Sequence, residues 1–221
     1  LADALQIHPL IARLLIHRGA DVPSSAQDFL CSDLSVLGSP HQLGDLKKAV
    51  SIIRQGVASR QKFLIVGDYD VDGLTGTALL YRALRELGAF VSTHIPHRMK
   101  DGYGLKAQVV EEAAQGGVKI LITVDCGTTA FGELGLARRL GMETLVVDHH
   151  DFDPRGRPEV SALMNPLDPD SHYPCKDLSS VGVAFTLARG LMDSDPLKAW
   201  EHLDLVALGT IADFSPLVGE N

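Results

Sequence analysis

The sequence predicts an α/β protein with a parallel sheet flanked by helices and preceded by an N-terminal helical segment. Three aliphatic runs each end at an aspartate, which is typical of strands buried on both faces. Helical patterns alternate with these runs between residues 63 and 148, whereas the first 60 residues show helical periodicity alone. Alternation of this kind implies right-handed crossovers between parallel strands. The expected sheet is therefore Rossmann-like.

Residues 1–60 are expected to be helical. The stretch LADALQIHPLIARLLIHRG has apolar residues three and four apart and stops at Gly19. The piece SSAQDFL opens on Ser25 as a cap, and DLKKAVSIIRQGVASR reads as an amphipathic helix capped by Asp45. We expect this segment to pack as a helical lead-in on a core domain of residues 61–221.

The core domain is expected to begin with alternating strands and helices. A loop rich in Pro, Asp and Arg, a short strand, an irregular stretch and two helices then follow. The expected strands are 63–67, 90–95, 119–124, 144–148 and 161–165, and the expected helices are 74–87, 106–115, 131–140, 179–192 and 196–213.

Composition limits the class of protein. With 221 residues, 45% of them apolar and 22% charged, the chain can bury one sizeable α/β core. No apolar stretch approaches the roughly 18–20 residues needed to span a membrane, so no membrane partner is expected. The chain begins on Leu1 rather than Met and ends abruptly at Asn221, so we expect a piece of a longer protein.

The cysteines favour a reducing compartment. Cys31, Cys126 and Cys175 are an odd number and form no CxxC pair. This pattern argues against a disulfide framework or a zinc site and favours the cytoplasm. We interpret Cys126 as a small buried residue, because no basic neighbour in sequence would activate its thiolate.

The acidic charge balance weakens a nucleic-acid function without excluding it. The formal net charge is −8, whereas nucleic-acid-binding proteins usually show a basic footprint. Five of the acids are proposed below as metal ligands, and setting them aside takes −8 to −3. Two divalent cations would then make the local field positive.

The strongest functional signal lies where the aliphatic runs end. The runs read FLIV-GDYDVDG, ILITV-Asp125 and ETLVV-Asp148-His149-His150. Carboxyl ends of parallel strands meet at one edge, where ligands bind. That edge therefore gathers at least five aspartates and two histidines, a set that needs cations to hold it together. This pattern predicts a metal-dependent hydrolase.

In the first motif, Asp68, Asp70 and Asp72 alternate in a tight loop that Gly73 allows to turn. Their carboxylates can converge on one hard cation, with Mn²⁺ or Mg²⁺ favoured by the oxygen ligands. A calcium loop would need a glutamate where Leu79 stands, so that alternative fails. Asp72 alone could be a helix cap, but a cap does not require three aspartates.

The other two runs also have structural alternatives. Asp125 could bridge two ions or cap helix 131–140, and Asp148 could likewise be a cap. Adjacent side chains leaving a strand point to opposite sides, so we expect His149 and His150 to act differently. One would ligate a metal and the other would face a phosphate.

Two further places are ambiguous from their residues alone. In the loop HRMKDGYGLK, Arg98, Lys100 and Tyr103 could grip a phosphate or stack a base, or the loop could be merely solvated. Asp213 ends a helical apolar face, where a polar residue is usually only a boundary.

The motifs together resemble the DHH phosphoesterase superfamily and, within it, the bacterial single-strand-specific 5′→3′ DNA exonucleases. The resemblance runs through GDYDVDGLTGTALL, HRMKDGYGL, TVDCGTT, VVDHHD, SSVGVAFTLA and ALGTIADFSPL, about residues 62–218, and extends to the N-terminal helical lead-in. It implies a site for two Mn²⁺ or Mg²⁺ ions, a phosphate-facing His150 and a supporting or ligating Asp148. The implied metal ligands are Asp68, Asp70, Asp72, Asp125, His149 and Asp213.

The resemblance also implies a substrate and partners. We expect hydrolysis of single-stranded DNA in repair and recombination, with replication or repair proteins as further partners. Two alternatives are a phosphodiesterase of cyclic dinucleotides or short RNA and an inactive scaffold, which would not need a complete site. Two departures stand out. Val66 replaces a histidine common in the superfamily, so Asp68 could supply that ligand. The superfamily's C-terminal domains are also not expected in these residues.

Overall fold

The computed structural model describes residues 1–30, 34, 37–192 and 196–221. These residues form two compact units. The first contains Leu1–Gly38 with Leu217–Glu220, and the second contains Ser39–Pro216 with Asn221. Cys31 lies outside the described residues.

The first unit holds the helices α1 (Ala2–Leu5), α2 (Pro9–His17) and α3 (Pro23–Leu30). Leu15, Ala20 and Ala26 form its small core. The single opening helix that the sequence predicted is two helices, because His8 caps a new one by accepting a hydrogen bond from the Leu10 amide. Ser25 is not the expected cap, since α3 starts two residues earlier and the Ser25 hydroxyl donates to the Val22 carbonyl.

The second unit is built on a five-stranded parallel sheet, which confirms the predicted fold class. Its strand order is β2-β1-β3-β4-β5. Side chains of the central strands are buried, whereas those of the edge strand β2 are largely exposed. The strands are β1 (Lys62–Gly67), β2 (Phe90–His94), β3 (Val118–Val124), β4 (Glu143–Val147) and β5 (Ala162–Met164).

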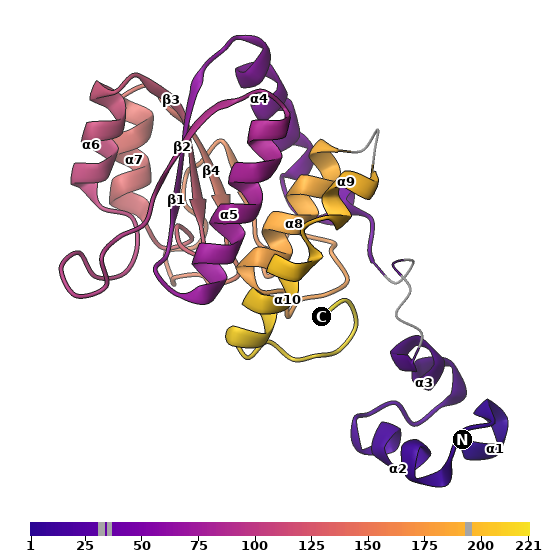
Figure 1. Cartoon of the computed structure of the whole chain (residues 1–221). Coiled ribbons are helices and arrows are strands. Elements are labelled where there is room, and N and C mark those ends of the chain that lie inside the picture. The colour runs from indigo at the N-terminus through magenta and orange to yellow at the C-terminus, as the bar shows by residue number, and fades with distance from the viewer. Residues whose placement is uncertain (31–33, 35–36, 193–195) are drawn as a thin grey trace. The chain divides into compact units, whose positions relative to one another are not determined.

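Helices cover both faces of this sheet (Figure 1). The helices α6 (Ala107–Gln115) and α7 (Phe131–Arg139) pack against the face that carries Leu64 and Val66. The other face is covered by α4 (Leu46–Ala58), α5 (Val71–Glu86) and α8 (Ser180–Leu191). The remaining short elements of this unit are η2 (Pro40–Gln42), α9 (Pro196–Trp200) and α10 (Leu203–Ala212).

Some boundaries differ from the prediction for local reasons. The helix expected over 196–213 is divided into α9 and α10, and α5 begins at Val71 because the Asp70 side chain caps it. Asp45 does not cap α4 with its side chain. Its carboxylate instead accepts from the Leu163 amide at 3.1 Å and pairs with Arg157.

The helix α4 belongs to the sheet unit, so the compact units divide near residue 38 rather than at the predicted boundary of 60. That the first unit packs on the sheet stays a prediction. Among the described residues, no helix combines the length and apolarity needed to cross a bilayer.

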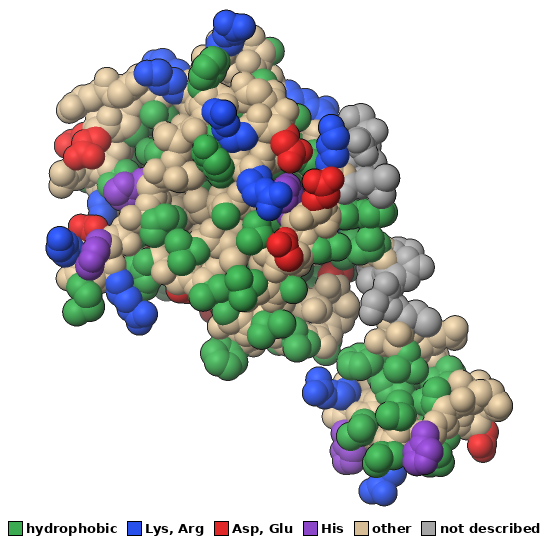
Figure 2. All heavy atoms as spheres, viewed as in Figure 1, with side chains coloured by type: hydrophobic (Ala, Val, Ile, Leu, Met, Phe, Trp, Pro, Cys, Tyr) green, Lys and Arg blue, Asp and Glu red, His purple; other side chains and the backbone are tan. Residues whose placement is uncertain are grey.

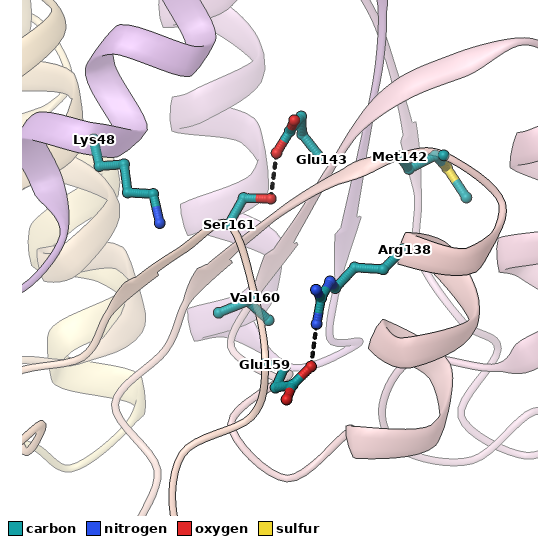
Figure 3. A pocket seen from close by; sticks show the side chains of 8 residues that line it. Lys48, Arg138, Met142, Glu143, Glu159, Val160 and Ser161 are labelled. Atoms are coloured by element: carbon teal, nitrogen blue, oxygen red, sulfur yellow. Dashed lines mark hydrogen bonds and ion pairs between the residues drawn. The ribbon is translucent and has the colours of Figure 1, made fainter.

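Strand order places a ligand-binding edge between β1 and β3. From β1 the chain moves outward to β2, then returns and continues in the other direction through β3, β4 and β5. Ligands bind at the carboxyl ends of strands where the order reverses in this way. A depression of about 700 Å³ lies instead at the amino ends of β4 and β5, where Arg138 pairs with Glu159 and Ser161 with Glu143 (Figure 3).

Candidate metal centre

The carboxyl edge of the sheet brings together all six metal ligands that the resemblance implied. Loops after β1, β3 and β4 supply four of them, the first turn of α5 supplies Asp72, and the C-cap of α10 supplies Asp213. Potential ligand atoms lie within 4.8 Å of one another in three groups. The groups are Asp68–Asp70–Asp125, Asp125–His149–His150 and Asp72–His149–Asp213.

The turn after β1 is tight because it folds back on its own backbone. Asp70 caps α5 by accepting from the Gly73 amide at 3.0 Å. A Cβ at Gly73 would lie 2.6 Å from the Asp68 carbonyl oxygen, so only glycine fits. Gly73 therefore permits a close approach of two backbones, whereas its own φ lies outside the left-handed region. The buried Oδ1 of Asp68 has no hydrogen-bond partner among the described residues, which suits a metal ligand.

Asp72 is held by the start of α8. Its two carboxylate oxygens accept from the Ser180 amide at 2.6 Å and the Val181 amide at 2.8 Å. The amino end of a helix attracts anions in this way. Burial nevertheless raises the pKa of Asp72 to about 6, although these two hydrogen bonds oppose the shift.

Asp125 belongs to two of the three groups, and its pKa is strongly raised. Its φ of 61° is left-handed, and its amide donates to the Val147 carbonyl at 3.0 Å. The Ser180 hydroxyl donates to its carboxylate at 3.0 Å. Burial, and then the nearby charges of Asp72 and Asp70, raise the pKa of Asp125 to about 10. In the absence of cations the raised pKa favours the protonated form of Asp125, and bound cations would displace that proton.

Asp148 is fully buried and organises the two histidines. It accepts from the amide of His149 at 2.8 Å and contacts His150 Nδ1 at 2.7 Å. The Thr128 amide donates to its other oxygen at 2.9 Å. Burial opposes ionisation of Asp148, but the hydrogen bond with His150 and the nearby histidine charge lower its pKa. The same hydrogen bond raises the pKa of His150.

The expectation that His149 and His150 point to opposite sides is wrong. Their ring centroids are 4.7 Å apart, and both rings belong to one potential ligand group with Asp125. The reason is that β4 ends at Val147, after which Asp148 accepts hydrogen bonds from both histidine amides and turns the chain. Strand alternation therefore does not apply to these two residues.

The two histidines still have different surroundings. His149 Nε2 lies 3.5 Å from Asp125, and His149 Nδ1 lies 3.9 Å from Asp213. His150 is more exposed and holds Asp148 through Nδ1. His149 therefore faces carboxylates of two potential ligand groups. In His150, by contrast, Nδ1 is already engaged by Asp148.

Asp213 reaches this site because α10 packs closely on α5. A Cβ at Gly209 would lie 2.4 Å from the Thr75 hydroxyl and 3.1 Å from the Asp72 carboxylate. Glycine therefore lets the two helices approach. The Asp213 carboxylate also accepts from the Ser215 hydroxyl at 2.8 Å, which orients it.

The three predicted substrate-binding residues differ in how closely they approach the metal centre. Tyr103 donates from its hydroxyl to the Asp125 carbonyl at 3.1 Å, and its ring meets His150 edge-on. The guanidinium of Arg98 lies over the ring of Tyr69, 5.3 Å from its centroid. Lys100 is exposed in the same loop, and its amide donates to the His97 carbonyl. Tyr103 therefore contacts the metal centre directly. Arg98 contacts Tyr69, in the turn between Asp68 and Asp70. No contact among the described residues links Lys100 to the metal centre.

Two supporting residues were missed by the sequence reasoning. Ser180 contacts both Asp72 and Asp125, and Asn165 donates to the His150 carbonyl at 2.9 Å and to the Thr128 hydroxyl at 3.2 Å. Asn165 directly follows the last strand, which was the available signal. Ser180 had none of its own, because a serine at the start of a helix normally indicates a cap.

Comparison with known proteins identifies the family. A sequence profile described as "DHH family, N-terminal domain" matches residues 62–210. The chain belongs to the DHH family. It is 40% identical over its whole length to the single-stranded-DNA-specific exonuclease RecJ of Bacillus subtilis, and 37% identical over 98% of its length to the protein of that name in Escherichia coli. The chain spans 28% and 39% of these two relatives.

A solved structure gives the same relationship. The crystal structure of RecJ in complex with Mn²⁺ from Thermus thermophilus matches with a TM-score of 0.79 and 33% sequence identity. The match covers 100% of this chain and 31% of that one. This DHH-family chain therefore corresponds to about a third of the relatives' length.

Val66 occupies the position where many members of the superfamily have a histidine, and the structure shows what surrounds it. Val66 is buried in β1 with the apolar core, so it offers no ligand. Asp68, two residues later, shares a potential ligand group with Asp70 and Asp125. Its position fits the expectation that Asp68 supplies the missing ligand.

Proposed function

We propose that the chain is the catalytic region of a metal-dependent exonuclease that hydrolyses single-stranded DNA from its 5′ end. The observation that carries the proposal is the convergence of six potential ligands into groups that share Asp125 and His149. The relatives named as RecJ exonucleases support the substrate. The cysteine pattern supports a cytoplasmic location, and replication or repair proteins remain the proposed partners.

The donor set fits two hard divalent cations. One position would be held by Asp68, Asp70 and Asp125, and the other by Asp72, His149 and Asp213, with Asp125 able to bridge them. Five of the six donors are carboxylates, which suit Mn²⁺ or Mg²⁺. When bound, two such ions activate a water and stabilise the attacking and leaving oxygens of an in-line displacement.

His150 and Asp148 are proposed to act on the phosphate. Asp148 engages His150 at Nδ1, so the ring would meet a phosphate oxygen through Nε2. The buried Asp148 carboxylate fixes that orientation. Tyr103 and Arg98 are proposed to line the approach of the strand, and Lys100 would contribute charge from the exposed loop.

The deciding experiment follows degradation of a long 5′-labelled single strand with Mn²⁺ or Mg²⁺. We expect short labelled products, loss of activity in EDTA and recovery with added Mn²⁺. A cyclic dinucleotide and a short RNA provide the comparison substrates. Faster cleavage of either would replace the proposed substrate, and full activity of Asp70→Ala would refute the proposed metal centre.

A further inference from the structure

Phe214 is both exposed and conformationally strained. Its side chain is 93% exposed, and its φ of 59° is left-handed. It directly follows Asp213, the C-cap residue of α10. Glycine or asparagine usually occupies this position, because a bulky residue is disfavoured there. Neither ring burial nor backbone preference accounts for a phenylalanine, which suggests that the ring serves a ligand.

The backbone on both sides of Phe214 is held. Its amide donates to the Ile211 carbonyl at 3.3 Å, and the next residue, Ser215, is buried and donates to Asp213 at 2.8 Å. That aspartate lies 3.9 Å from His149 Nδ1. A fixed turn therefore holds the backbone of Phe214 directly next to a proposed metal ligand, and the ring extends from there into solvent.

Further exposed apolar side chains flank the same edge of the site. Leu208 and Ile211 lie on the outer face of α10, and Val71 and Leu74 lie on the first turn of α5. These two helices pack side by side (Figure 1). Figure 2 shows hydrophobic side chains gathered over this part of the surface. We call these four residues and Phe214 the apolar ledge.

We propose that Phe214 stacks on a nucleobase of the strand whose phosphate enters the metal centre, with the apolar ledge carrying neighbouring bases. This inference rests on the proposed function. Every base has a π face, so stacking requires no particular sequence. Bases in a duplex are already stacked on one another, so the ledge would favour unpaired strands.

The test measures binding of single-stranded phosphorothioate oligothymidylate in Mn²⁺, against an abasic strand of equal length. Phe214→Asn removes the ring and suits the left-handed backbone. We expect this variant to bind the base-bearing strand about 5- to 150-fold more weakly, the range that corresponds to loss of one stacked base. Affinity for the abasic strand should not change, and Phe214→Trp should retain base-dependent binding.

Controls separate stacking from folding. Phe90→Asn removes another exposed phenylalanine, at the amino end of β2 and away from the metal centre, and should have no effect. Phe214→Gly should reproduce Phe214→Asn, and neither should lower the melting temperature.

Three results would overturn the inference: wild-type protein with no preference for bases, unchanged binding by Phe214→Asn, or equal loss for both strands. Failure of hydrolysis alongside a Phe214-dependent preference for bases would refute the proposed function alone.

Discussion

Replacing Asp125 by asparagine should stabilise the protein in the absence of metal ions. Asp125 is only 2% exposed. Burial first, and then the charges of the surrounding carboxylates, raise its pKa to about 10. Asparagine has nearly the same shape, can accept the same hydrogen bond from Ser180 and tolerates the left-handed φ. The change therefore removes the charge and leaves the local geometry in place.

The magnitude follows from the two pKa values. The unfolded chain releases the Asp125 proton near pH 3.8, whereas the folded chain keeps it until about pH 10. The folded state thus binds more protons between these values, so stability falls as pH rises, by up to about 1.4 kcal/mol per pH unit. From pH 3.8 to pH 7 this amounts to at most about 4 kcal/mol, which Asp125→Asn should recover.

Urea unfolding in EDTA, followed by circular dichroism from pH 5 to pH 8, measures this effect. Wild-type stability should decline with pH more steeply than that of Asp125→Asn. Asp177→Asn, at an exposed carboxylate, is the matched control and should follow the wild type. Saturating Mn²⁺ should reverse the order, because the wild type gains about 2.7 kcal/mol per ion at 100 times the dissociation constant. An Asp125→Asn protein that is less stable without metal would refute the reasoning.

Three further predictions concern single side chains. His149→Ala should lose bound Mn²⁺ after dialysis, whereas His150→Ala should keep it and lose most activity; equal metal loss by elemental analysis would show that the two roles are divided wrongly. Ser180→Ala should weaken Mn²⁺ binding about 10-fold in calorimetry, because its hydroxyl orients a ligand carboxylate; unchanged affinity would deny that role. Asp45→Ala should cost about 1–3 kcal/mol in urea unfolding by leaving the Leu163 amide without its acceptor, and no loss would mean that water replaces it.

Much of the fold could be predicted because the parallel strands follow a simple rule. Buried strands are continuous aliphatic runs, and the observed strands begin and end within about two residues of the predicted ones. Side-chain capping was predicted less well, because it depends on distant partners. Asp45 lies directly before a helix, yet its carboxylate binds Leu163 and Arg157, which are far along the chain.

In the candidate site too, residues at strand ends could be predicted from the sequence, whereas residues placed by contacts between distant segments could not. Strand ends alone predicted that Asp68, Asp125 and Asp148 would meet, since the sheet edge brings them together. Asp213 needed the family resemblance, because its position depends on the packing of α10 against α5. The orientation of His150 could not follow from alternation, because Asp148 redirects the chain after the strand has ended.

The close approach at Gly209 ties one metal ligand, Asp213, to the packing of two helices rather than to the sheet. Asp68 and Asp125 directly follow the paired strands β1 and β3, so the sheet fixes their spacing. Asp213 follows a helix, α10, that approaches α5 and α8 closely because Gly209 has no side chain. In Gly209→Ala, the added methyl group would push α10 away from its neighbours and move Asp213 with it. The size of the ion that the position of Asp72, His149 and Asp213 accepts would therefore depend on how closely two helices pack.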